Sequence, residues 1–330
     1  MIRRESVIRA SWLRRGANLW QWAVVSASLS LLAGSLAAFD APATSGSEVV
    51  VYAAQDQEYA EPILRQFEKE TGIRARAVFD SEAVKTVGLA NRLLSEQGHP
   101  QCDVFWSNEE LRTRQLSSRG AFRSTNGWLA IGYRSRRIAL NTNHVKLADA
   151  PRSLIDLTNR VWKGKIALAY PLFGTTAAHF MALRQTFGAT VWHQWCLALR
   201  ENKPMLVDGN SVVAQMVGRG EVWIGLTDSD DIAAEQREGA PIVALPLTRE
   251  SLLIPNTVAV VKNAPHAEPA QRLVEYLQRK EILQQLIKAH ALEGGQDHEL
   301  ARTTLKPDWD VVLADLSAAT AELEQVFIRP

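Results

Sequence analysis

The sequence has 330 residues, with 37 Lys and Arg against 36 Asp and Glu, so its formal net charge at pH 7 is +1. Five Arg and one Glu lie in the first 37 residues, which leaves a formal net charge of −3 on the rest of the chain. A mildly acidic chain argues against a nucleic-acid partner. The two Cys, 102 and 196, lie far apart in the sequence, which excludes a disulfide-rich scaffold and CxxC chemistry, and we expect two buried free thiols.

The N-terminal segment has the three-part pattern of a secretory signal. Five Arg, the last of them Arg15, precede the apolar stretch 23–38, and Ser35 and Ala37 are small residues of the kind that a signal peptidase needs. This stretch contains four Ser and is shorter than the roughly 20 apolar residues that a membrane span needs. We expect residues 1–37 to be a signal peptide and the chain to reach the periplasm. The alternative is an uncleaved membrane anchor.

After the signal segment, short apolar runs alternate with helical patterns. Residues 49–52 form an apolar strand, and a helix from about Gln57 carries apolar side chains on one face and stops at Gly72. Residues 73–79 alternate between apolar and polar side chains, as a half-buried strand does. Three more elements follow: a helix with apolar positions at 84, 87, 90 and 94, a strand at 104–106, and a helix opened by a Ser107–Glu110 capping box.

The same alternation resumes after Pro151. A strand at 166–170 runs into a helix opened by residues 173–176, and Trp192, Trp195, Cys196 and Leu199 form a helical stripe typical of a core. The later elements are short strands at 205–207, 222–226 and 257–261, a helix carrying Val213, Met216 and Val217, and a helical C-terminus.

Repeated strand–helix units predict an α/β fold with largely parallel sheets and helices on both faces. Two sets of such units, joined near residues 130–145 and again near 248–257, predict two lobes with two crossings. We expect residues 47–135 plus 255–330 to form the first lobe and residues 140–248 the second.

Candidate ligand-binding residues follow the strands, because ligands of such sheets sit beyond the carboxyl ends of the strands. Asp56 in the first turn and Ser107 in the third also fit simple helix caps, and Glu82 fits a first-turn carboxylate that the helix dipole favours. The first-lobe candidates are Gln55, Asp56, Ser81, Glu82 and Asn108, and those of the second lobe are Gly174, Thr175, Thr176, Asn210, Thr227 and Asp228.

Two of these turns have a specific chemistry. At residues 173–176, Gly allows close approach of the backbone, and two hydroxyls with the helix-start amides suit an anion; an ordinary Thr cap is the alternative. The acidic turn 227–231 offers Asp228 and Asp230 to a hard cation, with Glu82 as a further metal ligand. Caps with dipole-matched charges explain these carboxylates equally well.

Sequence motifs for catalysis are missing. The chain has no GxSxG, no HExxH and no phosphate-binding loop, and its seven His include no i, i+4 pair. We therefore expect a binding protein rather than an enzyme, with no cofactor. The expected partner is a small polar solute or a metal ion.

At these turns the chain resembles the bacterial extracellular solute-binding proteins of the ferric-iron importer group. The stretches that carry the resemblance are VYAAQDQEYA (51–60), CDVFWSNE (102–109), WKGK (162–165), FGTT (173–176), GLTDSDD (225–231) and IPNTV (254–258). The resemblance implies a two-lobed, hinge-closing periplasmic receptor of type II that delivers its ligand to an ATP-driven (ABC) permease of the inner membrane. We expect it to act as a monomer.

The resemblance is weaker at the ligand. Iron binders of this group hold the metal with an adjacent Tyr pair, a carboxylate, often a His, and a synergistic anion at a helix start. None of the five Tyr here is adjacent to another, and Thr227 and Asp228 stand where the pair would fall. Either ferric iron is held by carboxylates and a bound anion, or the ligand is itself an oxyanion, a phosphonate or a small carboxylate. A solute-sensing receptor, or an enzyme on the same scaffold, are the other functions that we considered.

Overall fold

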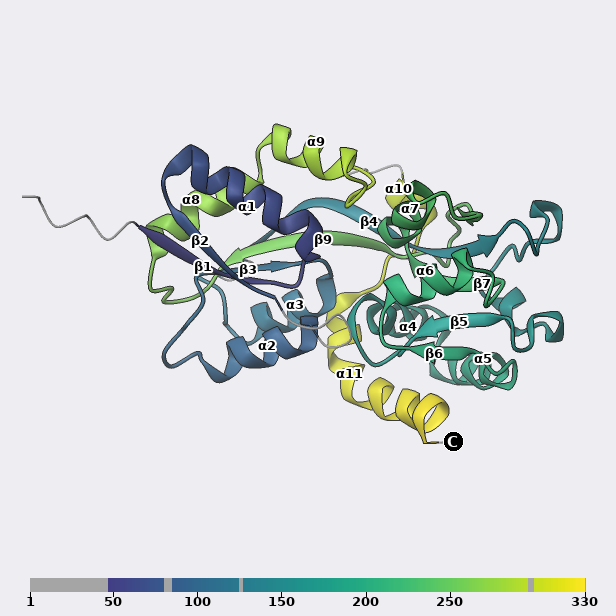
Figure 1. Ribbon diagram of the computed structural model, residues 1–330. Coiled ribbons are helices and arrows are strands. Elements are labelled where there is room, and N and C mark those ends of the chain that lie inside the picture. Colours follow the sequence, from purple (N-terminus) through teal and green to yellow (C-terminus); the bar gives the residue numbers. More distant parts are fainter. Residues whose placement is uncertain (1–46, 80–84, 125–126, 296–299, 330) are drawn as a thin grey trace, which may run out of the picture. The chain divides into compact units, whose positions relative to one another are not determined.

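The computed structural model describes residues 47–79, 85–124, 127–295 and 300–329 (Figure 1). The expected signal peptide at 1–37 lies outside the described residues, as do the candidate residues Ser81 and Glu82. None of the described helices is long and apolar enough to cross a membrane.

The first part of the chain consists of strand–helix units, as predicted. Its strands are β1 (Glu48–Ala53), β2 (Arg74–Val78) and β3 (Val104–Ser107), and its helices are α1 (Gln57–Thr71), α2 (Lys85–Ser95) and α3 (Glu110–Ser118). Helix α1 ends at the predicted stop, because Gly72 adopts the left-handed conformation with φ 71° and its amide bonds to the Glu68 carbonyl.

The second part repeats this pattern with more helices. Its strands are β5 (Ile166–Ala169), β6 (Met205–Val207), β7 (Ile224–Asp228) and β8 (Ile242–Ala244). Its helices are α4 (Gly174–Phe187), α5 (Ala189–Glu201), α6 (Asn210–Gly218) and α7 (Ser229–Arg237), preceded by the short helices η1 (Leu147–Asp149), η2 (Ile155–Thr158) and η3 (Arg160–Trp162).

Two long strands, β4 (Trp128–Asn141) and β9 (Leu253–Val260), connect these parts. The strand order is β2-β1-β3-β9-β4-β7-β5-β6, with β8 paired to β4. Strands β1, β2 and β3 pair in parallel, as do β5, β6 and β7, whereas β9 and β4 run antiparallel to their neighbours. The sequence pattern does not predict β4, because polar residues at 134–137 interrupt its apolar run.

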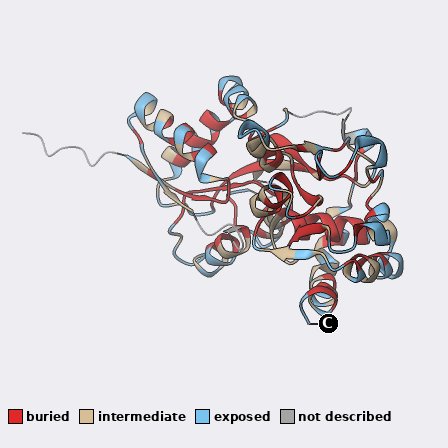
Figure 2. Cartoon of the chain, turned by 45° about the vertical axis from the view of Figure 1, so that its right-hand side comes forward, coloured by how far each residue is buried: buried red, intermediate tan, exposed pale blue. Residues whose placement is uncertain are grey.

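Both faces of the first part are covered by helices. Alternate residues of β1 face opposite sides, as a period of two requires: Val49, Val51 and Ala53 pack with α1, α8 and α9, and Tyr52 packs with α2 and α3. Figure 2 shows the strands buried between helices whose outer faces are exposed. This packing explains why the predicted helical faces are apolar on one side only.

The second part is built in the same way. Ile166 and Leu168 of β5 pack with α4, α5 and α11, whereas Ala167 and Ala169 face α6 and α7. The predicted stripe of Trp192, Trp195, Cys196 and Leu199 is buried, which confirms its role in the core. Cys102 and Cys196 are free and buried, as expected.

The C-terminal helices are shared between the two parts. They are α8 (Ala267–Leu277), α9 (Lys280–Lys288), α10 (Leu300–Thr303), α11 (Trp309–Leu323) and η4 (Glu324–Ile328). Helices α8 and α9 pack against β1, whereas α11 packs against α4, where Arg184 lies 2.5 Å from Asp315. Residues Ser45–Pro330 form one compact unit, and the expected lobe boundaries stay a prediction.

Candidate ligand-binding site

A pocket lies at the carboxyl ends of the parallel strands, where the sequence predicts the ligand site. Its water-accessible volume is about 40 Å³, room for roughly three water molecules. The lining residues come from both parts of the chain: Asp56, Thr86, Asn108, Arg134, Ala169, Tyr170, Phe173, Gly174, Thr175, Thr176, Asp208, Gly209, Asn210, Asp228 and Asp231. A pocket of this volume suits an ion or a very small solute.

The start of α4 forms one wall of this pocket. Gly174 adopts φ 54°, a left-handed conformation that glycine takes with little strain, and Phe173 is the N-cap. The main-chain amides of the first turn, Gly174 to Thr176, have no acceptor within the helix. As the sequence predicts, this turn is therefore suited to bind an anion.

The two threonine hydroxyls of this turn donate within the protein. Thr175 Oγ1 donates to Asp228 Oδ2 at 2.7 Å, and Thr176 Oγ1 donates to Asn210 Oδ1 at 3.1 Å. Asn210 in turn donates through Nδ2 to Thr175 Oγ1 at 2.9 Å. In this structure neighbouring side chains accept both hydroxyl protons, so the main-chain amides are the donors that remain for an anion. Contact of the two hydroxyls with a ligand stays a prediction.

Two buried arginines of β4 support the pocket, and the sequence pattern did not identify them. Arg136 Nη1 donates to Asp228 Oδ1 and to Asn210 Oδ1, each at 2.7 Å, and Nη2 donates to the carbonyl of Leu226. Arg134 Nη2 lies 3.0 Å from Asp228 Oδ2, and Nη1 donates to Asp230. The sequence feature that could have identified them is their spacing of two residues, because side chains two residues apart lie on the same face of a strand.

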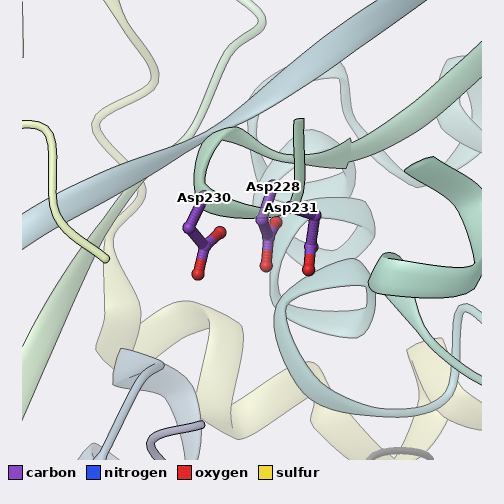
Figure 3. A group of neighbouring side chains, drawn as sticks. All are labelled: Asp228, Asp230 and Asp231. Atoms are coloured by element: carbon purple, nitrogen blue, oxygen red, sulfur yellow. The ribbon is translucent and has the colours of Figure 1, made fainter. Parts of the chain in front are cut away.

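The acidic turn brings three carboxylates together. Asp228 ends β7, and Asp230 and Asp231 lie in the first turn of α7. One oxygen from each of the three lies within 4.8 Å of the others, and Figure 3 shows the three side chains pointing to the same side. The Asp228 side chain makes no capping hydrogen bond, so the simple cap does not explain it.

These three carboxyl groups differ in charge. Burial raises the pKa of Asp228, but Arg134 and Arg136 together hold it below its usual value. Burial raises the pKa of Asp230 to about 7 despite the nearby Arg134. Burial and the charges of its two neighbours raise the pKa of Asp231 well above its usual value. The cluster therefore holds protons that a bound cation would displace.

The first part of the chain contributes two candidates to the pocket. The side chain of Asp56 is 27% exposed and lies 4.0 Å from Arg134 Nη1. Asn108 Nδ2 donates to Asp56 Oδ2 at 3.4 Å. Asp56 is the N-cap of α1 but makes no capping hydrogen bond through its side chain, and the residue lines the pocket.

The capping box proposed at Ser107 is wrong. Helix α3 begins at Glu110, and its N-cap is Glu109, whose carboxylate accepts from the amide of Arg112 at 3.0 and 3.2 Å. The chain is still extended at Glu109, so Ser107 lies too early to cap the helix. Burial raises the pKa of Glu109 to about 7.

Several sequence candidates lie elsewhere. Gln55 is buried and accepts a hydrogen bond from Asn256 in the core, and Thr227 is buried with its hydroxyl on the Asn210 carbonyl. Asp230 belongs to the acidic cluster but not to the pocket lining. The candidates that do line the pocket are Asp56, Asn108, Gly174, Thr175, Thr176, Asn210 and Asp228; Arg134, Thr86, Tyr170, Asp208 and Asp231 join them.

Comparison with known proteins places the chain in one family. The sequence profile described as bacterial extracellular solute-binding protein matches residues 49–290. Among curated relatives, the major ferric iron-binding protein of Neisseria meningitidis serogroup A is 26% identical over 310 residues, covering 86% of this chain and 92% of that protein.

Solved structures have the same fold. Iron-bound HitA from Pseudomonas aeruginosa matches with a TM-score of 0.72 at 20% identity, over 86% of this chain and all of that one. A Trichodesmium protein in complex with iron and citrate matches with a TM-score of 0.67 at 19% identity, over 85% of this chain and 99% of that one. These likenesses establish the two-lobed type II fold of periplasmic binding proteins for this chain.

Proposed function

Because the chain belongs to the bacterial extracellular solute-binding protein family, we propose that it is the periplasmic substrate-binding component of an ABC importer for ferric iron. The curated relatives named for ferric iron support this cargo, and so does the solved relative that holds iron with citrate. The family is one of binding proteins, which agrees with the absence of catalytic motifs in the sequence.

The observation that carries the proposal is the oxygen-rich lining of the small pocket. Four aspartates and Tyr170 line it, and carboxylate and phenol oxygens are hard ligands that suit a hard cation. The lining carboxylates are Asp56, Asp208, Asp228 and Asp231. At about 40 Å³ the pocket has room for a single ion beside these oxygen ligands.

The site has more acidic than basic side chains. Its carboxyl groups are the four of the lining and Asp230, and its guanidinium groups are those of Arg134 and Arg136. This excess favours a cation, which would displace the protons that burial keeps on Asp230 and Asp231. Asp228 is held by both arginines, so we assign the metal contacts to Asp231, Asp56 and Tyr170, with Asp228 as a fixed negative charge beside them.

We further propose that iron arrives with a small anion. The first-turn amides of α4 would hold this anion, since the helix start is suited to negative charge. Arg134 lines the pocket, and within the described residues its Nε has no hydrogen-bond partner. The same observation favours the second candidate, in which the solute is itself an oxyanion, a phosphonate or a small carboxylate.

Calorimetry and metal analysis of the exported protein test this function. Natively purified protein should contain iron, and iron-free protein should bind ferric citrate. Asp231→Asn and Tyr170→Phe should each weaken the affinity for ferric citrate about tenfold or more, and a tenfold loss corresponds to about 1.4 kcal/mol of binding free energy. Asp149→Asn, in an exposed short helix outside the pocket, is the matched control and should bind as the unsubstituted chain does.

Two results would replace this proposal. Tight binding of phosphate, a phosphonate or a carboxylate without iron would favour the anion-binding alternative. Normal iron uptake in a strain lacking the gene, with the protein still binding ferric citrate, would favour a sensing receptor over an importer component.

A further inference from the structure

A second surface lies at the opposite end of the second part from the pocket. The parallel pairing of β5 with β6 and β7 places their first residues, Ile166, Met205 and Ile224, at one edge. The antiparallel β4 ends at this edge with Asn141. The loops beyond this edge, at the right of Figure 1, include the short helices between β4 and β5.

The chain at this edge is basic. We define the distal surface as residues 146–165 and 200–205, which contain seven Lys or Arg and three Asp or Glu. The sequence after residue 37 has a formal net charge of −3, whereas the distal surface has four more basic than acidic residues. Positive charge is therefore concentrated at this surface. Lys146, Lys163 and Lys203 are exposed. Asp156 accepts the amides of Arg152 and Ser153, which turns its carboxylate toward the main chain.

Large apolar side chains are exposed among these cations. Leu147 is 65% exposed, Ile155 and Val161 are each 56% exposed, and Met205 is 46% exposed. These four are half of the exposed large apolar side chains in the described part of the chain. Asn202 joins the segments that carry them, because its Nδ2 donates to the carbonyls of Leu157 and Asn159 at 2.8 Å.

An aromatic group completes the edge. The ring of Trp223 stacks on His144 with centroids 5.3 Å apart, and Lys165 Nζ lies 3.6 Å from the centre of the indole. Trp beside Lys is the combination that proteins place at the headgroup level of a membrane.

From these contacts we propose that the distal surface binds an anionic phospholipid membrane. Cations attract the headgroups, and single apolar side chains on short helices enter the headgroup region without needing a complementary partner shape. An acidic protein is the less favoured partner, because the apolar side chains lie singly on separate turns rather than in one continuous face. The surface is remote from the pocket, so this inference is independent of the cargo.

Vesicle sedimentation tests the proposal. The exported protein should sediment with vesicles of phosphatidylethanolamine and phosphatidylglycerol at low salt, and not with phosphatidylcholine vesicles. The pair Lys163→Glu and Lys203→Glu should weaken binding to the phosphatidylglycerol vesicles at least tenfold, and so should the pair Ile155→Ser and Val161→Ser. Unchanged far-ultraviolet circular dichroism and unchanged ferric citrate binding show that both variants are folded.

The control variant reverses the charge of two lysines outside the distal surface. Lys280→Glu with Lys288→Glu on α9, both exposed, should leave vesicle binding unchanged. Equal losses in both charge-reversed variants would show a general charge effect and overturn the proposal. Sedimentation only with vesicles that contain a membrane protein would assign the surface to a protein partner and would also overturn it.

Discussion

Arg136 Nη1 lies 2.7 Å from Asp228 Oδ1, and neither side chain is exposed. The register of β4 and β7 places these two residues directly opposite each other. Arg136 also binds Asn210, and Asp228 accepts from Thr175, so this pair holds the polar side chains of two helix starts in place. A fixed, buried ion pair at the base of the pocket reduces the reorganisation needed when a ligand binds.

Breaking this pair should strongly destabilise the fold. We expect Arg136→Met to lower the free energy of unfolding by about 3–5 kcal/mol, because it leaves a buried carboxylate with fewer partners. Urea denaturation followed by tryptophan fluorescence measures this loss. Arg160→Met removes an exposed pair with Glu201 at 3.4 Å and should change stability by less than about 1 kcal/mol. Similar effects of the two substitutions would contradict the role of the buried pair.

Glu109 should make stability depend on pH. Its carboxyl group ordinarily titrates near pH 4.5, and burial raises its pKa to about 7 in the folded chain. Between these values the folded chain holds a proton that the unfolded chain has released, so the free energy of unfolding should fall as pH rises through this window and level off above it. Urea denaturation at several pH values measures the slope.

Glu109→Gln isolates this contribution. Gln keeps an acceptor for the Arg112 amide but does not titrate. The free energy of unfolding should therefore fall less steeply between about pH 4.5 and 7, and it should be higher at pH 8 than in the unsubstituted chain. Glu201→Gln, on the exposed end of α5, should leave the slope unchanged. An unaltered slope in Glu109→Gln would show that the group titrates normally.

Removing the hydroxyl of Thr175 should destabilise the fold more than removing that of Thr176. Thr175→Val removes a donor to the buried Asp228 and should cost about 1–3 kcal/mol of stability. Thr176→Val should cost less, because Asn210 Oδ1 still accepts from Arg136. Denaturation of both variants, with calorimetry of ferric citrate binding, compares them. A larger loss for Thr176→Val would contradict the hydrogen-bond assignment.

Arg237 should affect ligand affinity from outside the pocket. From the end of α7 it donates to the Tyr59 hydroxyl of α1 at 3.2 Å and to the Ala289 carbonyl at 3.0 Å. Arg237→Ala removes these contacts between the two parts of the chain. It should therefore weaken the affinity for ferric citrate by about five- to tenfold, or roughly 1 kcal/mol. Calorimetry measures the change, and Arg272→Ala on α8 is the exposed control.

A second substitution tests the Arg237 contact itself. Tyr59→Phe in the Arg237→Ala background should add little further loss, because the hydrogen bond between the two side chains is already absent. Additive losses would mean that the two residues act separately.

The sequence by itself determined most of the helices and strands, though not β4, and the edge of the sheet where the site lies. Periods of two and 3.6 in apolar residues reflect burial of one face, which is a local property of each segment. Glycine at 174 reports a backbone conformation in the same local way, so the start of α4 was predictable. These signals were sufficient for the fold class and for part of the pocket lining, such as Asp56, Asn108 and the start of α4, but not for Tyr170 and Asp208, which also follow strands.

Only the tertiary structure decided which charged side chains form ion pairs. Arg136 and Asp228 are 92 residues apart, and their contact depends on the register of two strands that sequence patterns do not fix. The same limit applies to Gln55, which follows a strand as expected but binds Asn256 in the core. Local periodicity reports which side of an element is buried, whereas the partner of a buried charge is set by long-range pairing.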